Sequence, residues 1–241
     1  MTRVWLIAKR DLVGALTSWM GWLILSSLLL LHGFAFNGIA MGAEAKSSEV
    51  ISMFFYLSSG FVAAAGVLLS MRTFAEDRQT GTLTLLESSL ASEWELVVGK
   101  FLGAYLFLLL YLLFTAYMPL LVVVNGSINI EHVVVGYVGL VLLGAAIVAV
   151  GTLTSSLAPS QLAAAIAGAV AVVFLFLCYQ IGAKVEGALG DVVTYLDLFF
   201  EHYRTFTRGT FKLSTAVYFL SLAYIALLAS KNVVQQQRWR G

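Results

Sequence analysis

A long uncharged segment constrains the fold of this chain more than any other feature: residues 133–183 contain no Asp, Glu, Lys or Arg. A helix rises about 1.5 Å per residue, so roughly 20 apolar residues cross the hydrocarbon of a bilayer. The uncharged segment is about twice that length, and its one polar interruption is the run at 154–161. We therefore expect two membrane-spanning helices that flank a tight loop in this run.

The same reasoning predicts four further spans. Only 11% of the 241 residues are charged, whereas a soluble domain carries about 25%. No charge occurs between Asp11 and Glu44, and the remaining apolar runs are also long enough to cross a bilayer. We expect one all-α membrane domain over residues 1–241, with six transmembrane helices near residues 19–41, 50–71, 101–124, 133–154, 161–183 and 213–230.

Two segments outside the spans have amphipathic patterns. Residues 2–18 place apolar side chains largely on one helical face with basic side chains beside them, which predicts an N-terminal interfacial helix or, alternatively, a basic flank of the first span. Residues 184–212 are polar enough to lie outside the bilayer core, and they predict an interfacial or partly re-entrant helix before the sixth span. Its apolar stripe would be Val192, Leu196, Phe199, Phe200 and Tyr203.

The first apolar run could alternatively be a secretory signal peptide. Ala43-Glu44-Ala45 has the form of a cleavage site. The apolar run before it is longer than the 7 to 15 residues of a typical signal peptide, so we expect no cleavage.

Six spans put both chain ends on one side of the membrane, and cytoplasmic loops carry an excess of Lys and Arg. The side of the chain ends and of the segment between spans two and three carries Arg3, Lys9, Arg10, Arg72, Arg78, Lys100, Lys231, Arg238 and Arg240. The opposite side carries Lys46, Lys184, Arg204, Arg208 and Lys212. The charge bias predicts cytoplasmic chain ends, and the segment before span six weakens it.

The charged segment at 72–100, between spans two and three, has its own helical pattern. Its apolar residues recur at spacings of three and four, which places them on one helical face: Leu83, Leu86, Leu90, Trp94 and Val97. Thr84 with Glu87, and Ser92 with Glu95, fit the S/T-x-x-E pattern of a helix start. We expect a short amphipathic helix, a turn near residues 88–92 and then the next span. Such a helix between two spans suggests a docking surface.

Several kinds of chemistry are missing from the sequence. There is no phosphate-binding G-x-x-x-x-G-K-[ST] loop, and the spans have no ionisable carboxylate or cation near their middle. His32, His132 and His202 each lack a second metal-type ligand three or four residues away, so no metal site is expected. The net charge of +1 favours no nucleic-acid partner, and a single cysteine forms no intrachain disulfide. If the chain does work across the membrane, a partner must supply the energy.

Small and polar residues within the spans have two interpretations each. Gly99 with Gly103, and Gly136, Gly139, Gly144 and Gly151, predict close helix packing within the bundle or, alternatively, a seam between two chains. Six polar residues in or near the spans are candidates for a translocation path, although hydrogen bonding between helices explains them equally well. They are Asn37, Tyr56, Ser58, Ser59, Tyr179 and Gln180.

The central segment resembles the permease subunit of type-2 ABC exporters. In that family the segment between spans two and three commonly has an acidic-basic run, Gly-Thr-Leu, an apolar helix, a Ser-rich turn and Glu-Leu-Val-x-Gly-Lys. The matching residues are Glu76, Asp77, Arg78, Gly81, Thr82, Leu83, Leu85, Leu86, Glu87, Ser88, Ser89, Ser92, Glu95, Leu96, Val97, Gly99 and Lys100. The family often has a proline where this chain has Leu90. Residues 151–162 and 202–209 extend the resemblance, which is greatest to the gliding-motility-associated permease branch.

The resemblance implies that ATP and Mg²⁺ bind in a separate nucleotide-binding subunit, with no catalytic residue and no cofactor in this chain. A coupling helix at 78–87 would dock on that ATPase through Glu76, Asp77, Arg78, Gly81, Thr82, Leu83, Leu86 and Glu87. Six spans would be half of a transport unit, so a second permease chain, identical or related, is expected. A periplasmic or membrane accessory subunit and membrane lipids are further candidate partners. The implied location is the bacterial inner membrane.

Two other classes of function fit the same sequence. A membrane anchor or force-transmitting subunit of a motility or envelope complex would need the same helices but would move no solute. A membrane enzyme such as a lipid transferase would need clustered carboxylates or histidines at the membrane surface. The only candidates are Glu76 with Asp77, and Asp197 with Glu201 and His202, although such residues are more often solvated or capping groups.

Overall fold

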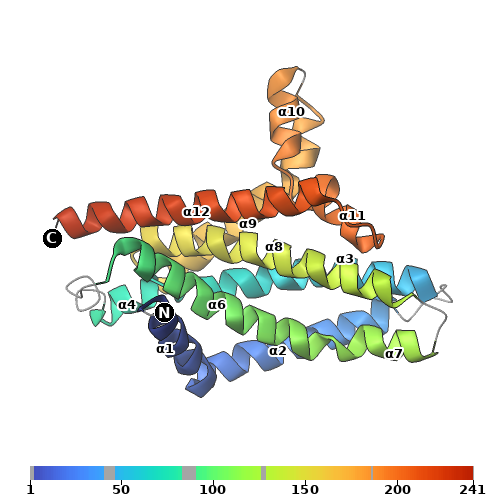
Figure 1. Cartoon of the computed structure of the whole chain (residues 1–241), viewed down its shortest axis with the longest axis horizontal. Helices are drawn as coiled ribbons and strands as arrows, with labels where there is room; N and C mark the ends of the chain where they lie inside the picture. Colours follow the sequence, from blue (N-terminus) through green and yellow to red (C-terminus); the bar gives the residue numbers. More distant parts are fainter. Residues whose placement is uncertain (1–2, 41–46, 83–90, 126–128, 186, 241) are drawn as a thin grey trace.

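The computed structural model of the chain describes residues 3–40, 47–82, 91–125, 129–185 and 187–240. Over these ranges the regular elements are helices and there is no strand. Six of the described helices are long and apolar enough to cross a membrane. The predicted all-α membrane fold is therefore confirmed. Figure 1 shows the long helices running roughly along one axis, with both chain ends at the same end of the bundle.

The candidate spans are α2 with the π-helix η1, α3 with α4 at its end, α6 with α7, α8, α9 and α12. Shorter helices lie before and between them. In chain order the elements are α1 (Arg3–Thr17), α2 (Trp19–Ala35), η1 (Phe36–Ala40), α3 (Ser47–Ser70), α4 (Ala75–Gln79), α6 (Glu93–Thr115), α7 (Tyr117–Asn125), α8 (Ile130–Leu157), α9 (Gln161–Gly182), α10 (Ala188–Tyr195), η2 (Phe199–Tyr203), α11 (Arg204–Thr207) and α12 (Leu213–Arg240).

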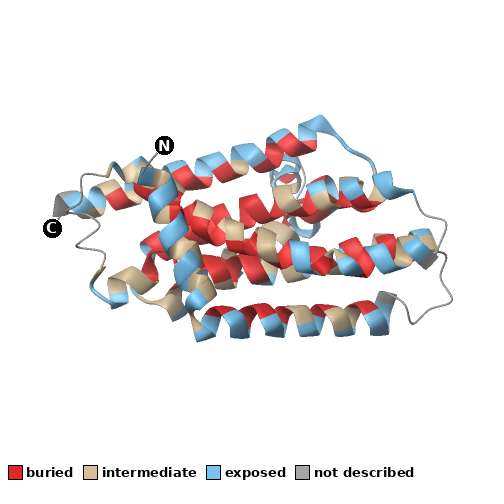
Figure 2. Ribbon diagram, turned by 60° about the horizontal axis from the view of Figure 1, so that its bottom comes forward, coloured by how far each residue is buried: buried red, intermediate tan, exposed pale blue. Residues whose placement is uncertain are grey.

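Helix α8 is the centre of the bundle, where it contacts α3, α6, α9, α11 and α12. Its glycines face these neighbours. A Cβ atom at Gly139 would lie 2.6 Å from the Cβ of Phe206 on α11, and one at Gly144 would lie 2.6 Å from a methyl carbon of Leu108 on α6. The predicted packing role of these glycines is confirmed. Figure 2 shows the buried residues gathered where the helices face one another.

The pair Gly99 and Gly103 on α6 serves a contact within the chain. Helix α1 crosses α6 at these residues, so that a Cβ atom at Gly99 would lie 2.8 Å from the Cβ of Ile7, and one at Gly103 would lie 2.9 Å from the Cβ of Asp11. Gly99 and Gly103 thus allow α1 to approach α6 closely within one chain. The alternative role for this pair, a seam between two chains, is not needed to explain them.

Helix α6 begins at Glu93, where Ser92 and Glu95 form the capping box that the S/T-x-x-E pattern predicted, so the helix starts before the apolar run at 101–124. Helix α12 continues beyond the span expected at 213–230 and ends at Arg240. The loop predicted at 154–161 is confirmed: α8 ends at Leu157, and the side chain of Ser160 caps the start of α9.

The segment before α12 is not the single helix that its apolar stripe predicted. It divides into α10, η2 and α11, and α10 projects sideways from the bundle (Figure 1). The residues of the predicted apolar stripe do not share one environment: Val192 and Leu196 are exposed, whereas Phe199 and Tyr203 are buried. The hydroxyl of Tyr203 donates to the carbonyl of Phe55 on α3 at 3.1 Å. After residue 198, contacts with the bundle rather than an amphipathic pattern therefore determine the position of the segment.

Polar groups inside the spans pair between helices. His32 on α2 is fully buried; its Nδ1 lies 2.8 Å from the hydroxyl of Tyr111 on α6, and its Nε2 lies 3.1 Å from the Oγ of Ser58 on α3. The Ser58 hydroxyl donates to the carbonyl of Phe54 at 2.7 Å, so it accepts from Nε2. The proton of His32 is then on Nε2, and Nδ1 accepts from Tyr111. This histidine joins three spans.

We expect Gly139→Ala to destabilise the chain by about 1–3 kcal/mol, because the new methyl group would overlap the side chain of Phe206. Gly60→Ala on α3 is the matched control, since no atom lies within 4 Å of the added carbon. The measurement is unfolding of the full chain in detergent micelles. Equal stability of the two variants would contradict this account of the α8–α11 contact.

Candidate functional site

The turn between α3 and α4 is held by a serine near the end of α8. The Oγ of Ser155 accepts from the backbone N–H groups of Phe74 and Ala75, both at 3.1 Å, and donates to the carbonyl of Met71 at 3.0 Å. Ser155, Phe74 and Ala75 are all buried. The turn therefore has a fixed position relative to α8, although its residues are distant from α8 in the sequence.

Helix α4 is attached to two further elements by Arg78. The guanidinium donates to the carbonyl of Ser156 at 3.0 Å and to the carbonyl of Ala158, both near the α8–α9 loop. It also donates to the side-chain oxygen of Gln237 on α12 at 2.8 Å, and the amide of Gln237 donates to Ser156 at 3.0 Å. These bonds join α4, the α8–α9 loop and the last turns of α12 in one network.

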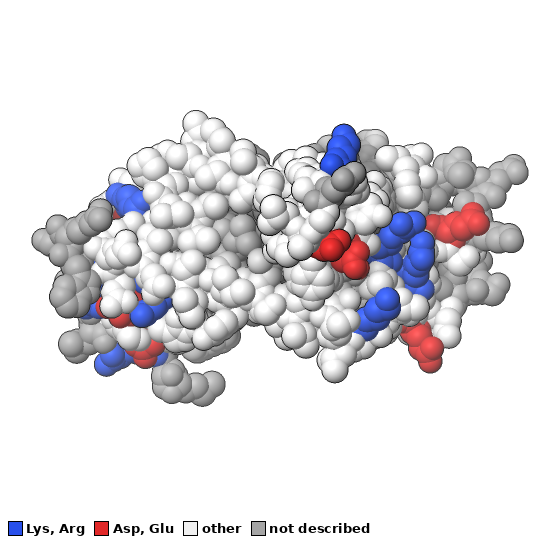
Figure 3. Space-filling view, turned by 90° about the horizontal axis from the view of Figure 1, so that it is seen from above, with Lys and Arg blue, Asp and Glu red and all other residues white. Residues whose placement is uncertain are grey.

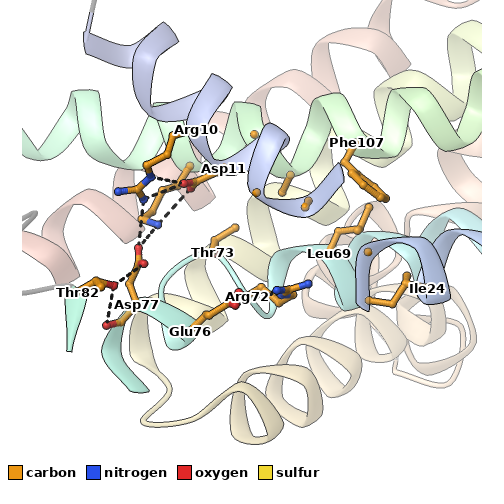
Figure 4. A pocket seen from close by; sticks show the side chains of 16 residues that line it. Arg10, Asp11, Ile24, Leu69, Arg72, Thr73, Glu76, Asp77, Thr82 and Phe107 are labelled. Carbon is orange, nitrogen blue, oxygen red and sulfur yellow. Dashed lines mark hydrogen bonds and ion pairs between the residues drawn. The ribbon is translucent and has the colours of Figure 1, made fainter. Parts of the chain in front are cut away.

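A cluster of ion pairs joins α4 to α1 and α6. The ammonium of Lys100 on α6 pairs with the carboxylates of Asp77 on α4 and Asp11 on α1, the latter at 3.3 Å. Arg10 pairs with Asp11 at 2.8 Å and with Asp77 at 3.6 Å (Figure 4). Only 2% of Lys100 is exposed, and its ammonium lies 5.4 Å from the ring centre of Phe74. A buried ammonium is tolerated only with such partners.

Two shorter contacts shape α4 and the residues after it. Arg72 donates two hydrogen bonds to the carboxylate of Glu76, at 2.7 and 2.8 Å. The hydroxyl of Thr82 donates to Asp77 at 2.8 Å across a turn in which Gly81 has a φ of 74°. This left-handed conformation suits glycine and ends the helical path. The helix predicted at 78–87 is therefore interrupted within the described residues, because α4 ends at Gln79 and a turn follows at Thr80 and Gly81. Residues 83–87 lie outside the described residues.

A cavity of about 360 Å³ lies beside these charges, between α1, α2, the α3–α4 region and α6 (Figure 4). One part of its wall is charged, and the other is apolar or small. The charged part consists of Arg10, Asp11, Arg72, Glu76, Asp77 and Lys100, and the apolar part includes Ile24, Leu69 and Phe107. Gly14 on α1 also lines the cavity, and a Cβ atom there would meet no atom within 4 Å. A change in the position of α4 would change the shape of this cavity.

The start of α6 is attached to both chain ends. Ser92 accepts from the N–H of Glu95 at 3.2 Å while the Glu95 carboxylate accepts from the N–H of Ser92 at 2.9 Å. Glu93 pairs with Arg238 on α12 at 2.9 Å, and Glu95 lies 3.9 Å from Arg3 on α1. The predicted capping box is confirmed. Of the predicted docking residues, Leu83, Leu86 and Glu87 lie outside the described residues, as does the capping pair Thr84 and Glu87.

The docking residues that the structure describes lie together, and most of them have partners that sequence reasoning missed. Glu76, Asp77, Arg78, Gly81 and Thr82 all belong to α4 or to the turn after it. Asp11, Lys100, Ser155 and Gln237, which bond to them or to the turn before them, come from four distant parts of the sequence. The one sequence signal for such pairing is a lysine and an aspartate close to the apolar spans, where unpaired charges are costly.

The six candidate residues of a translocation path are dispersed in the single chain. Ser58 and Ser59 are buried and bond within the bundle, whereas Asn37 and Gln180 are exposed. Tyr56 and Tyr179 are also exposed, and each contacts a phenylalanine of η2, with ring centres 5.2 and 5.3 Å apart. These two tyrosines therefore lie on the same flank of the bundle. Their part in a path stays a prediction.

Asp197, a candidate for membrane enzyme chemistry, lies in the segment before α12 and acts as a cap. Its side chain is fully buried, and its oxygens accept from the backbone N–H groups of Glu201 at 3.1 Å and Tyr179 at 3.4 Å. Burial raises the pKa of Asp197, although the hydrogen bonds from the backbone oppose the shift. The carboxylate therefore joins η2 to the end of α9.

His202, the neighbouring candidate, has an equally structural environment. Its Nε2 lies 3.0 Å from the carbonyl of Tyr195, and its ring stacks on Tyr218 of α12 with centres 3.6 Å apart. Only 5% of the residue is exposed, and this burial lowers the pKa of His202. His202 therefore attaches the end of α10 to α12.

We expect Lys100→Met to destabilise the chain by about 3–5 kcal/mol, because it leaves Asp77 and Asp11 without their buried counter-ion. Arg238→Met removes a more exposed pair and is the control, with an expected cost of about 1 kcal/mol or less. Adding Asp77→Asn to Lys100→Met should recover part of the loss. Thermal unfolding in micelles measures all three, and equal losses for the two single variants would contradict the buried-pair account.

We also expect acidification to destabilise the wild type more than His202→Phe. Because burial lowers the pKa of His202, the unfolded chain binds a proton below about pH 6.5 before the folded chain does. The neutral, buried His202 therefore contributes to the stability of the folded chain above the ordinary histidine pKa of about 6.5, and this contribution is lost as the pH falls toward the lowered pKa of His202. Asp197, whose pKa is raised, acts in the opposite direction and is common to both proteins. Melting temperatures at about pH 7.5 and 5.5 test this, and equal shifts would refute it.

Comparison with known proteins identifies a family for the chain. The family model described as ABC-2 family transporter protein matches residues 5–230 of the chain. The matched region contains α4, the ion-pair cluster and nearly all of the six spans. A search of curated proteins finds no match.

Proposed function

Because the chain belongs to the ABC-2 family of transporter proteins, we propose that it couples ATP hydrolysis in a separate subunit to export across the cytoplasmic membrane. Its own part is that of a permease, a multi-pass membrane component that is not itself catalytic. The observation that supports the proposal best is the set of bonds around α4. Its charged side chains contact α1, α6, the α8–α9 loop and α12.

The docking surface for the nucleotide-binding subunit is α4 together with the residues that follow it. Gln79 and Thr80 at the end of α4 are exposed, while Asp77 and Arg78 are directed toward the bundle through their bonds. An ATPase that contacts the exposed side would therefore act on residues whose other side is attached to the spans. Leu83, Leu86 and Glu87 complete the predicted surface.

A rigid-body movement of α4 would reach the spans through three routes. The Lys100 cluster transmits it to α1 and α6, Ser155 transmits it to α8, and Arg78 transmits it to the α8–α9 loop and α12. A ligand shifts such an equilibrium only through different affinities for its two states. ATP and Mg²⁺ in the partner would provide this difference, and the rearrangement of packed helices would reshape the path.

The proposed assembly contains two permease chains and two ATPase subunits. Six spans in the described residues are half of such a transport unit, and the second permease is identical or related. The dispersed path residues agree with this stoichiometry, since an exposed flank with Tyr56 and Tyr179 becomes part of a path only when another chain faces it. A periplasmic or membrane accessory subunit is a further proposed partner.

The proposed orientation places both chain ends and α4 in the cytoplasm. Figure 1 shows these three features at one end of the bundle. Arg10, Arg72, Arg78 and Lys100 gather there, which agrees with the excess of cations in cytoplasmic segments. From the family resemblance we further propose that this membrane is the inner membrane of a bacterium.

The family match leaves the branch of the family open. A place in the gliding-motility branch rests on the resemblance of residues 151–162 and 202–209. The alternative to export, a force-transmitting subunit that moves no solute, differs in one measurable quantity. Vesicles with the permease and its ATPase would show nucleotide-dependent movement without solute flux.

We expect Arg78→Ala to lower transport about tenfold, because coupling between two sites usually accounts for a 5- to 150-fold effect. Gly81→Pro and Leu86→Asp should act in the same direction, the first because proline cannot adopt the positive φ of Gly81. The measurement is ATP-dependent transport, together with ATPase activity, in vesicles that contain the permease and the co-purified ATPase. Inserted protein is quantified for each variant.

Lys184→Ala, an exposed residue after α9, is the matched control and should transport as the wild type does. Full transport by Arg78→Ala, Gly81→Pro and Leu86→Asp would refute the coupling role of this segment. Failure of the wild-type chain to co-purify with any ATPase would refute the proposed function itself.

A further inference from the structure

Three cations lie close together at the end of the bundle remote from the chain ends. Arg204 begins α11, Arg208 follows its last residue, and Lys212 precedes α12. All three are exposed, and within the described part of the chain none of their side chains forms a hydrogen bond or ion pair. Figure 3 shows a group of Lys and Arg side chains on the face from which α10 projects. These cations are therefore available to a partner from outside the described part of the chain.

The backbone that carries these cations has a fixed position. Phe206 is fully buried against Gly139 of α8. The Nε2 of His132 on α8 lies 2.8 Å from the carbonyl oxygen of Thr207. The N–H of Thr210 then donates to the carbonyl of Thr205 at 3.1 Å, which folds the chain back on α11. The cations are therefore presented by a rigid platform.

The position of α11 on the side of the bundle determines whether the three cations face lipid or water. Helix α11 lies beside the first turns of α8, near the end of the bundle but on its side (Figure 1). Phe211 and Leu213, next to Lys212, are 52% and 71% exposed. The side of a membrane-spanning bundle faces lipid, and long cationic side chains beside exposed apolar ones extend to the headgroups. In a bilayer the three cations would then lie at the level of lipid phosphates.

Figure 3 shows Asp and Glu side chains at the border of the group, but among the described residues no carboxylate forms an ion pair with Arg204, Arg208 or Lys212. Glu131 on α8 accepts from the side chain of Asn129 at 3.2 Å, and Glu201 on η2 is exposed. Neither lies within 4.0 Å of a cationic nitrogen among the described residues. A group of Lys and Arg on the side opposite the chain ends also opposes the usual charge bias, so it calls for a compensating interaction.

We propose that Arg204, Arg208 and Lys212 bind the phosphate groups of anionic phospholipids in the leaflet remote from the chain ends. Arg donates hydrogen bonds to phosphate from a planar fork, and each cation near an anionic membrane surface adds to the attraction. The apolar contacts of Phe211 and Leu213 hold the acyl region beside the same site. This surface is separate from α4, so it does not depend on the ATPase partner.

The full chain is tested in nanodiscs of phosphatidylcholine that contain about one third phosphatidylglycerol. Native mass spectrometry counts the lipids of each class that remain on the protein after release. Arg204→Gln/Arg208→Gln/Lys212→Gln should lower the retained ratio of phosphatidylglycerol to phosphatidylcholine by roughly tenfold. Arg204→Lys/Arg208→Lys/Lys212→Arg should keep most of it, and Lys184→Gln, which removes an exposed cation outside the group, should keep all of it.

A second measurement leaves the cations in place. Phe211→Trp provides a fluorophore at the proposed site, and brominated phosphatidylglycerol should quench it more than brominated phosphatidylcholine at the same fraction, after subtraction of the wild-type signal. Equal quenching, or an unchanged lipid ratio in the triple Gln variant, would overturn the proposal. So would a loss of dimers in that variant with the lipid ratio unchanged, since the group would then be an interface between two copies.

Discussion

A charge buried away from water needs an opposite charge beside it, and the end of the bundle that carries α4 and both chain ends depends on that requirement. Lys100 is 2% exposed, so Asp77 and Asp11 cannot move away from it without a large loss. Three elements are joined in this way: an amphipathic helix, a five-residue helix and a long span. The proposed coupling segment therefore has a defined position before any partner binds.

The remaining positions follow from close packing around α8. Lipid is as apolar as the side chains, so helices associate through shape and through hydrogen bonds rather than through the hydrophobic effect. Gly139 and Gly144 allow α11 and α6 to approach, and His32 connects α2 to α3 and α6. These contacts explain why short pieces such as α11 have one orientation although their own helical stability is small.

The sequence predicted those features that depend on neighbouring residues. The six spans follow from the length of apolar runs, and the start of α6 follows from Ser92 and Glu95, because both signals are local. The break after α4 was missed, since Gly81 fits a helix pattern as well as a left-handed turn. The division of the segment before α12 was missed because the cap from Asp197 joins it to α9. The partners of α4 are long-range contacts, which a pattern in one sequence does not identify.

The length of α12 has a consequence for how the two ends of the molecule communicate. This helix runs from Leu213 to Arg240, about 42 Å, as one α-helix. Its first turns stack Tyr218 on His202, and its last turns bond Gln237 to Arg78. A helix resists stretching, so it behaves as a stiff rod between these two attachments. Tilting the rod at its Arg240 end would swing the Leu213 end, and the segments attached there would follow without any hinge between them.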